Sequence, residues 1–551
     1  MTADDPVGAT DGPAYQVVIV GGGPVGMGLA LELGLRGVRC AVVERHERPQ
    51  PIPKGQNLTQ RTMEHFRSWG VESAVRSARV MPADAPTSGV TAYGTLLGDY
   101  WYPWWRRSAL RPYYYADNER LPQYYTEEVL RAAASSDGNV DCLIGWTATS
   151  VIDEGSSVAV EIEGRGRDSP KMLRAQYAVG CDGSRSMVRE QAGMELRRTD
   201  HDKAMVLLVF RSAELHRLLT ERHPDASFFN VLHPDLDGYW QFLGRVDDQG
   251  QWFFHAPVES ARSGTPEAAA CERLVRAAVG AHVDVAFDYI GVWDLRFASA
   301  RRYRRGRVFV AGDAAHSHPP YGGYGINTGF EDARNLGWKL AAALRGWAGE
   351  GLLDSYDAER RSVFESTSED FIEAFIERDR RFVRSFDPEA DREAFERAWS
   401  ARQVRDDGVA TFEPHYEGSP VVLGPPGGVS SARGSHSLAA RPGHHLPPCA
   451  LSAAAAAAAR SVDSRAADVS DLLGRDFSLV ALDVPPAWVE GFQSAAAQSG
   501  IPLVVLTDSF DGDRRQYGCR LALVRPDHYV AWVGSGAPKD PAAILAMATG
   551  H

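Results

Sequence analysis

A run of apolar residues near the start of the chain is the clearest pattern in the sequence. Residues 17–20 are all β-branched and pass directly into a glycine-rich turn at 21–26. Apolar residues then continue from 27 to 35 with helix-like spacing, and a second apolar strand at 39–43 ends at a glutamate. The order of strand, tight turn, helix and strand predicts a βαβ unit.

The chemistry of this turn predicts a dinucleotide site. Gly21 supplies an unusual φ, Gly23 allows the backbone to approach a pyrophosphate, and Gly26 allows the helix to pack on the strand. The diphosphate would lie on free N–H groups at the positive end of the helix dipole. Glu44 stands 21 residues after Gly23, where a Rossmann fold places the acid that accepts ribose hydroxyls. A glycine-rich loop in a purely structural α/β domain is the alternative reading.

Further along the chain, the pattern alternates between two kinds of structure. A strand at 177–181 ends in Asp-Gly at 182–183, which continues the α/β pattern. From 205 to 257 the pattern changes to short alternating strands, which predicts an inserted β-rich layer. The α/β pattern returns after about residue 290, and a strand at 307–311 ends in Gly-Asp at 312–313.

The last third of the chain predicts a long helix and then a separate small domain. The helix covers residues 330–345, and the new region starts near residue 405 after a charged helical stretch. A seven-alanine run at 453–459 is read as a helix or a linker. Apolar strands at 477–482 and 502–506 predict a small α/β domain.

Composition narrows the class of protein. The 551 residues suggest two or three domains, and the net charge of −13 argues against a nucleic-acid partner. Six cysteines lie far apart with no CxxC pair, which predicts reduced thiols in a cytoplasmic protein. The acidic N-terminus does not resemble a signal peptide. The glycines of the first apolar run, with the flanking Glu32 and Arg36, favour a dinucleotide site over a membrane span.

An aromatic patch at residues 100–115 stands out from this composition. It contains Tyr100, Trp101, Tyr102, Trp104 and Trp105, and then three consecutive tyrosines at 113–115. Such residues line pockets for flat apolar ligands and also form subunit contacts, so a substrate pocket and a homodimer contact both stay open. Contact with a membrane surface is a third reading, although we expect no membrane partner.

Four elements in one order give these patterns a common meaning. They are the glycine turn with Glu44, Asp182-Gly183, Gly312-Asp313, and a second glycine-rich turn at 322–329. This combination resembles the FAD-dependent aromatic hydroxylases, the group A flavin monooxygenases of the p-hydroxybenzoate hydroxylase type. The resemblance covers residues 15 to about 400. The C-terminal region resembles the thioredoxin-like tail of the phenol and polyketide hydroxylase branch and, lacking CxxC, is expected to be structural.

The resemblance implies an α/β fold with a Rossmann-like FAD-binding domain, an inserted β-sheet substrate domain and a thioredoxin-like C-terminal domain. The expected boundaries are 1–80, 120–190 and 290–405 for the FAD-binding domain, 81–119 and 191–289 for the substrate domain, and 406–551 for the C-terminal domain.

The resemblance also implies a set of FAD contacts. By this resemblance, Asp313 accepts a hydrogen bond from a ribityl hydroxyl of FAD. N–H groups at the start of the long helix stabilise negative charge on the reduced flavin. The family usually has Ala-Arg where this chain has Pro53-Lys54, and lysine supplies charge without a bidentate fork. The residues assigned to FAD are Gly21, Gly23, Pro24, Val25, Gly26, Glu44, Arg45, Lys54, Gln123, Asp182, Gly312, Asp313, Pro320, Gly323, Gly325, Ile326 and Asn327.

Residues for substrate and catalysis are less defined by the sequence. His255 and Gln241 are read equally well as buried sheet residues, and no catalytic acid or base follows from the sequence. Asp313, His316 and His318 have a spacing that suggests a metal, but the Gly-Asp strand end already explains Asp313, so we expect no metal site. The expected substrate-pocket residues are Tyr239, Gln241, His255, Pro320 and Tyr321.

The resemblance implies an FAD-dependent monooxygenase. In this reaction NADPH or NADH reduces FAD, O2 adds to the flavin, and the C4a-hydroperoxide transfers one oxygen to a phenolic or polycyclic aromatic substrate. Baeyer–Villiger oxygen insertion, antibiotic modification and an FAD-dependent dehydrogenase without oxygenase activity are the alternatives.

Overall fold

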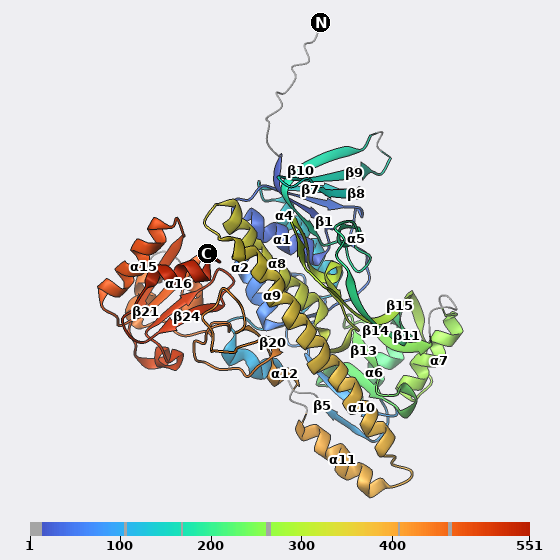
Figure 1. Ribbon diagram of the computed structural model, residues 1–551. Coiled ribbons are helices and arrows are strands. Elements are labelled where there is room, and N and C mark those ends of the chain that lie inside the picture. Colours follow the sequence, from blue (N-terminus) through green and yellow to red (C-terminus); the bar gives the residue numbers. More distant parts are fainter. Residues whose placement is uncertain (1–13, 104–106, 167–168, 260–265, 406–407, 461–465) are drawn as a thin grey trace.

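The computed structural model in Figure 1 describes residues 14–103, 107–166, 169–259, 266–405, 408–460 and 466–551. Two large sheets and a smaller C-terminal sheet make up most of the molecule. The long helices α8 (Gly325–Leu344) and α9 (Glu350–Ser366) run between the C-terminal region, drawn in red, and the sheets of the N-terminal part (Figure 1). Within the described part of the chain, every helix is too short or too polar to cross a lipid bilayer.

The first sheet has the doubly wound arrangement that the βαβ pattern predicts. Its path is β16-β17-β10-β1-β2-β7, in which all the neighbours from β17 to β7 pair in parallel, and β8 and β9 extend it from β10. The chain leaves β1 in one direction and returns on its other side at β10, so the topological switch point lies between these two strands. The strands are β1 (Tyr15–Val20), β2 (Cys40–Glu44), β7 (Val140–Ile144), β8 (Trp146–Asp153), β9 (Val158–Gly164), β10 (Lys171–Gly180), β16 (Arg304–Arg305) and β17 (Val308–Val310).

Helices on the first sheet explain its hydrophobic pattern. The strand residues 17–20 are buried, because α1 (Pro24–Gly34), α8 and the flanking strands cover them. α2 (Gln60–Ser68) and α4 (Gln123–Ser135) also belong to this part of the fold. α8 begins at Gly325, five residues before the predicted start, so the second glycine-rich turn runs into its first turns.

The second sheet has the order β18-β15-β11-β14-β13-β12-β4-β5. α6 (Ala213–Arg222) and α7 (Ala268–Val279) cover one face of it. The opposite face packs against Ile52, which follows β2 in the chain. The strands are β4 (Ser88–Tyr93), β5 (Trp101–Pro103), β11 (Leu196–Arg211), β12 (Ala226–Leu232), β13 (Trp240–Arg245), β14 (Gln251–Glu259), β15 (Ala286–Ala300) and β18 (His316–Ser317).

The C-terminal sheet has the order β22-β21-β23-β24, with β21 and β22 parallel and β23 antiparallel to both of its neighbours. This is the arrangement of a thioredoxin-like domain and confirms that prediction. The alanine run forms α13 (Ala453–Arg460), and all six cysteines are free thiols. The remaining elements are β21 (Phe477–Leu482), β22 (Leu503–Asp508), β23 (Leu521–Val524), β24 (Val530–Gly534), α15 (Pro486–Gln498) and α16 (Pro541–Ala548).

A buried ionic network connects the C-terminal sheet to α8 and α9. The carboxylate of Glu359 in α9 accepts hydrogen bonds from both terminal nitrogens of Arg525, at 2.6 and 3.0 Å. It also accepts one from Lys339 of α8 at 2.7 Å and one from Ser419 at 2.6 Å. Arg525 reaches on to Asp527. All these charged side chains are fully buried, so each one depends on its partners.

Because of this network, the free energy of unfolding is expected to fall in acid. Burial alone would raise the pKa of Glu359, but the charges of Arg525 and Lys339 outweigh it and hold that pKa well below its ordinary value of about 4.5. The unfolded chain therefore binds more protons below about pH 5, and the stabilisation present above that pH is lost as pH falls. We expect the urea midpoint to fall between pH 5 and 3, and to fall less steeply in Glu359→Gln.

Two tyrosines of the aromatic patch pack against a helix of the same chain. Tyr102 is buried against Trp399 of α11 (Arg392–Arg405), with ring centroids 5.1 Å apart, and Tyr100 packs on Phe395 of the same helix at 4.8 Å. Trp101 is 39% exposed. Residues 104–106, which include two tryptophans of the patch, lie outside the described residues. Tyr100 and Tyr102, at and just before β5, therefore attach α11 to the second sheet.

Candidate active site

A cavity of about 530 Å³ opens at the carboxyl ends of the parallel strands β1, β2 and β10. This is the place where doubly wound sheets bind ligands. Four segments that are far apart in the sequence meet there. The predicted residues that line the cavity are Gly21, Gly23, Pro24, Val25, Glu44, Arg45, Lys54, Gln123, Asp182, Asp313, Pro320, Gly323, Gly325 and Ile326.

Gly21, Gly23 and Gly26 of the first turn are each suited to glycine for a different structural reason. Gly21 has a φ of +106°, and a side chain there would collide with the carbonyl of Cys181. A side chain on Gly26 would collide with the carbonyl of Gly21. At Gly23, by contrast, an added Cβ would meet no protein atom within 4 Å. No protein atom therefore requires a glycine at position 23. The space next to its Cα is part of the cavity.

The start of α1 is suited to a negatively charged group. Its first turn has no acidic residue and no side-chain cap, so its first N–H groups remain available. Glu44 closes the next wall: its carboxylate accepts the N–H of Gly22 at 2.7 Å and the N–H of His46 at 2.6 Å. These bonds fix the orientation of the carboxylate and leave each oxygen a further lone pair for a hydroxyl donor.

Asp182 has a buried carboxylate oxygen that a ligand in the cavity could engage. The N–H of Val188 donates to its Oδ2 at 3.1 Å, but its Oδ1 is buried and has no hydrogen-bond partner among the described residues. Burial raises the pKa of this carboxyl. A buried acceptor on the wall of a cavity requires a donor. A polar ligand that bears hydroxyl or N–H groups supplies one.

Asp313 is held by a buried network that the sequence did not indicate. The N–H of Gly312 donates to Asp332 of α8 at 2.9 Å, and Asp332 also pairs with His316 and with Arg360 of α9, both at 2.7 Å. The side chain of Asp313 is exposed to the cavity. The protein around it nevertheless limits the solvation of the carboxylate, which raises its pKa. Because His316 is turned toward Asp332, it does not converge with Asp313 in the way that a metal site requires.

The start of α8 forms the far wall. Gly325 and Ile326 line the cavity, and this first turn again has no acidic residue and no cap. Asn327 does not line it. Its side-chain oxygen accepts the N–H of Thr59 at 2.9 Å, and its nitrogen donates to the carbonyls of Asn57 and Gly323 at 2.8 and 2.7 Å. Asn327 therefore fastens the glycine turn to the start of α2.

Two of the predicted substrate residues lie on opposite faces of the second sheet. His255 lies on the same face as Phe253, and Ile52, which lines the cavity, packs on this face. Burial lowers the pKa of His255 to about 3, so its ring is neutral at pH 7. Side chains along β13 point alternately to the two faces of the sheet. Gln241 therefore lies on the other face, with Leu243, beneath α6 and α7.

The other predicted substrate residues lie beside the second glycine turn. The hydroxyl of Tyr321 accepts the N–H of Trp240 at 3.3 Å, and Tyr239 belongs to the same buried cluster. Pro320 lines the cavity. The structure thus brings Pro320, Tyr321 and Tyr239 together at the end of the second sheet.

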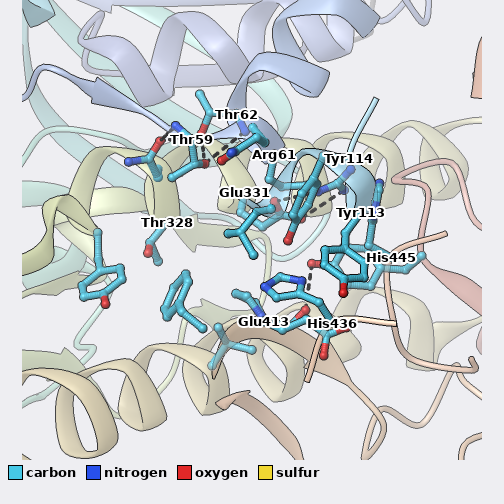
Figure 2. Close-up of a pocket in the computed structure, with 18 of the residues that line it drawn as sticks. Thr59, Arg61, Thr62, Tyr113, Tyr114, Thr328, Glu331, Glu413, His436 and His445 are labelled. Carbon is cyan, nitrogen blue, oxygen red and sulfur yellow. Dashed lines mark hydrogen bonds and ion pairs between the residues drawn. The ribbon is translucent and has the colours of Figure 1, made fainter. Parts of the chain in front are cut away.

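A second, smaller cavity of about 70 Å³ lies between the start of α2 and the C-terminal region. Figure 2 shows Tyr113, Tyr114, Glu413, His436 and His445 around it. The ring of Tyr114 stacks on His445 at 5.4 Å and that of Tyr113 on His436 at 5.1 Å. The cavity is about half the ~150 Å³ that accommodates benzene in a protein core, so it is too small for an aromatic substrate.

Comparison with known proteins agrees with the site. Residues 14–370 match the FAD binding domain family, and residues 439–551 match the aromatic-ring hydroxylase C-terminal family. The chain is 34% identical to 4-methyl-5-nitrocatechol 5-monooxygenase of a Burkholderia species, over 96% of each chain. It is 31% identical to tetracenomycin A2 monooxygenase-dioxygenase of Streptomyces glaucescens, over 97% of this chain and 95% of the relative.

The solved structures agree as well. The rebeccamycin biosynthetic enzyme RebC with reduced flavin superimposes with a TM-score of 0.81 at 29% identity, covering 97% of this chain and 99% of RebC. The predicted fold and cofactor are confirmed by these matches. The chain belongs to the FAD-dependent aromatic-ring hydroxylases, flavin monooxygenases that use a reduced nicotinamide and O2.

Proposed function

We propose that this protein hydroxylates a phenolic aromatic substrate that binds between the FAD cavity and the inner face of the second sheet. The observation that carries the proposal is the convergence of four sequence-distant segments on one cavity at the switch point of the sheet. We further propose the predicted three-part division of the chain, with the second sheet as the substrate domain.

Named residues of the cavity suit the parts of FAD. The N–H groups after Gly23 would hold the diphosphate, and Glu44 and Asp313 would accept ribose and ribityl hydroxyls. The free N–H groups of Gly325 and Ile326 would stabilise negative charge on the reduced ring. When bound, FAD supplies the redox chemistry, taking up hydride from the nicotinamide and activating O2.

The protein's own contribution is to exclude water and to orient the aromatic ring. The inner face of the second sheet is apolar, with Phe228, Phe253 and Leu207 buried in it. His255 on this face is neutral at pH 7, because burial lowers its pKa to about 3. It is therefore a weak base and cannot serve as a general acid at that pH.

Arg120 is the residue that we propose to hold the substrate's anionic oxygen. Its guanidinium is buried, and its carbon lies 4.4 Å from the ring centroid of Phe228. One nitrogen donates to Gln56, which lines the cavity, at 3.3 Å. Its other two nitrogens have no hydrogen-bond partner within the described ranges. Burial, and then the charge of Arg245, lower its pKa to about 9. A buried cation with free donors is costly unless an anion pairs with it.

The names of the relatives support this substrate class. The Burkholderia relative is named for a nitrocatechol and the Streptomyces relative for tetracenomycin A2. A phenol carrying an electron-withdrawing group ionises readily, and its phenolate is both electron-rich and complementary to an arginine. We therefore propose a phenol that binds as its phenolate.

Incubation with NADPH and ¹⁸O2, with a panel of catechols and polycyclic phenols, tests the proposed function. The expected product carries one labelled oxygen on a ring carbon, and NADPH consumption depends on the substrate. A lactone or ester product would show Baeyer–Villiger insertion instead. NADPH oxidation without label in any organic product would contradict the proposal.

Substitution of Arg120 by methionine is expected to raise the KM for the phenol by about tenfold or more, with bound FAD unchanged, because one charge-assisted hydrogen bond contributes about 1.5–3 kcal/mol. Steady-state kinetics and the flavin absorbance measure the two effects. Arg211→Met is the matched control, since Arg211 is half exposed at the end of β11 in the second sheet. Equal KM values in both variants would remove Arg120 from the substrate site.

A further inference from the structure

A buried cluster of two histidines and a glutamate lies outside the FAD cavity, beside the C-terminal domain. His415 lies in β19 (Phe412–Tyr416), Glu417 follows this strand, and His444 lies in a turn farther along the chain. One nitrogen or oxygen atom from each residue lies within 4.8 Å of the other two. The N–H of Tyr416 donates to the carbonyl of Gly443 at 2.7 Å, so the backbone itself holds the two segments together.

The hydrogen bonds of His415 fix which of its nitrogens bears the proton. Its Nε2 lies 3.1 Å from the carbonyl oxygen of Arg433. A carbonyl only accepts, so Nε2 carries the hydrogen and Nδ1 carries a lone pair. Nδ1 is buried and has no hydrogen-bond partner in the described part of the chain, and the residue is only 7% exposed. An imidazole nitrogen in this state is ready to bind a metal.

His444 shows the complementary arrangement. Its Nδ1 lies 2.9 Å from Glu413, and its Nε2 lies 2.8 Å from Glu417. Arg441 also donates to Glu413, at 2.7 Å, and so holds this carboxylate in place as an acceptor. A carboxylate that accepts from one nitrogen of a histidine orients the other nitrogen toward a metal. The metal-facing atoms are then Nε2 of His444 and the neighbouring oxygen of Glu417.

We propose that His415, Glu417 and His444 bind one divalent metal ion of the zinc class. Two imidazoles, one carboxylate and one open position form a ligand set that Zn²⁺ accepts. The side chain of Glu417 is 28% exposed, which gives the ion a route from solvent and leaves room for a water ligand. An ion pair between His444 and Glu417 alone would leave Nδ1 of His415 unpaired. The rings of His415 and His444 stack with centroids 4.7 Å apart and planes 17° apart, so both rings would rotate toward a metal ion that engages all three residues.

The position of the site indicates a structural role. The ion would cross-link β19 to the turn at His444, whose carbonyl accepts the N–H of Val530 in β24 at 2.9 Å. Glu413, which orients His444, also lines the small cavity of Figure 2. A metal here would therefore stiffen the junction between the C-terminal domain and the rest of the protein.

Metal binding by the untagged, chelator-treated holoenzyme tests the proposal. Calorimetric titration with Zn²⁺ is expected to show one equivalent, and Co²⁺ is expected to produce visible absorption bands. His415→Ala and Glu417→Gln are expected to weaken Zn²⁺ binding by at least about tenfold, and Glu413→Gln by about 10–100-fold. The flavin content of each variant reports whether it has folded. If His415→Ala loses its flavin and has therefore not folded, Glu417→Gln is the decisive variant. Glu417 is partly exposed, so this substitution is expected to leave the fold intact.

His282→Ala is the matched control, because His282 is exposed and lies outside the cluster. This variant is expected to keep the wild-type affinity for Zn²⁺. Wild-type protein that binds no equivalent of Zn²⁺ would overturn the proposal. Unchanged Zn²⁺ affinity in a folded His415→Ala or Glu417→Gln variant would overturn it as well.

Discussion

Gly23→Ala is expected to remove most of the FAD from the purified protein without destabilising the flavin-free chain. The backbone at Gly23 has φ −73°, which any residue adopts, and an added Cβ would meet no protein atom within 4 Å. The substitution should even stabilise the flavin-free chain by about 0.4–1 kcal/mol, through the lower entropy of its unfolded state. The methyl group would instead occupy space that the diphosphate needs.

We expect the affinity for FAD to fall by about 100-fold or more, which corresponds to about 3 kcal/mol. Flavin absorbance of the purified protein and FAD titration of the flavin-free protein measure this loss. Gly26→Ala is the contrasting variant, because its Cβ would collide with the carbonyl of Gly21 and lower the stability of the fold itself. Full flavin content in Gly23→Ala would show that the diphosphate does not lie at this turn.

Arg525→Met is expected to destabilise the holoenzyme by about 3–5 kcal/mol, the usual effect of removing one member of a buried ion pair. The change leaves Glu359 with Lys339 as its one remaining cation among the described residues, and it leaves Asp527 without its cation in the buried junction. Urea unfolding followed by tryptophan fluorescence measures the loss, and proteolysis should release the C-terminal domain earlier.

Arg515→Met is the matched control for this prediction, since Arg515 is 69% exposed and its ion pair with the nearby Asp511 lies at the surface. Its effect should stay within about 0.5 kcal/mol. If the two variants unfold at the same urea concentration, the buried network does not hold the domains together.

The sequence predicted the parts of this fold that depend on local pattern. The first βαβ unit, the Gly-Asp strand end and the strands of the C-terminal domain follow from apolar periodicity and glycine positions, because both are short-range properties. The start of α8 was placed five residues late, since the glycines that open this helix resemble a loop. The sequence also does not show that the side chain of Asn327, a residue that the resemblance places at FAD, holds the glycine turn against the start of α2.

Long-range pairing explains what the sequence could not predict. Asp332 and Arg360, which hold Gly312, lie on different helices, and no spacing in the sequence connects them. Arg120 is notable only because two of its buried guanidinium nitrogens have no hydrogen-bond partner among the described residues. His415 and His444 lie 29 residues apart, outside any common metal-binding motif, and the turn at Gly443 brings them together.

Anaerobic reduction of the bound flavin by NADPH and NADH, with and without phenols, tests the central claim most directly. We predict that the flavin absorbance bleaches slowly with the nicotinamide alone and much faster when the correct phenol is present. That result would show that the aromatic substrate binds next to the flavin and controls its reduction. Bleaching at the same rate with every phenol, or a protein that retains no flavin after FAD is added, would contradict the account.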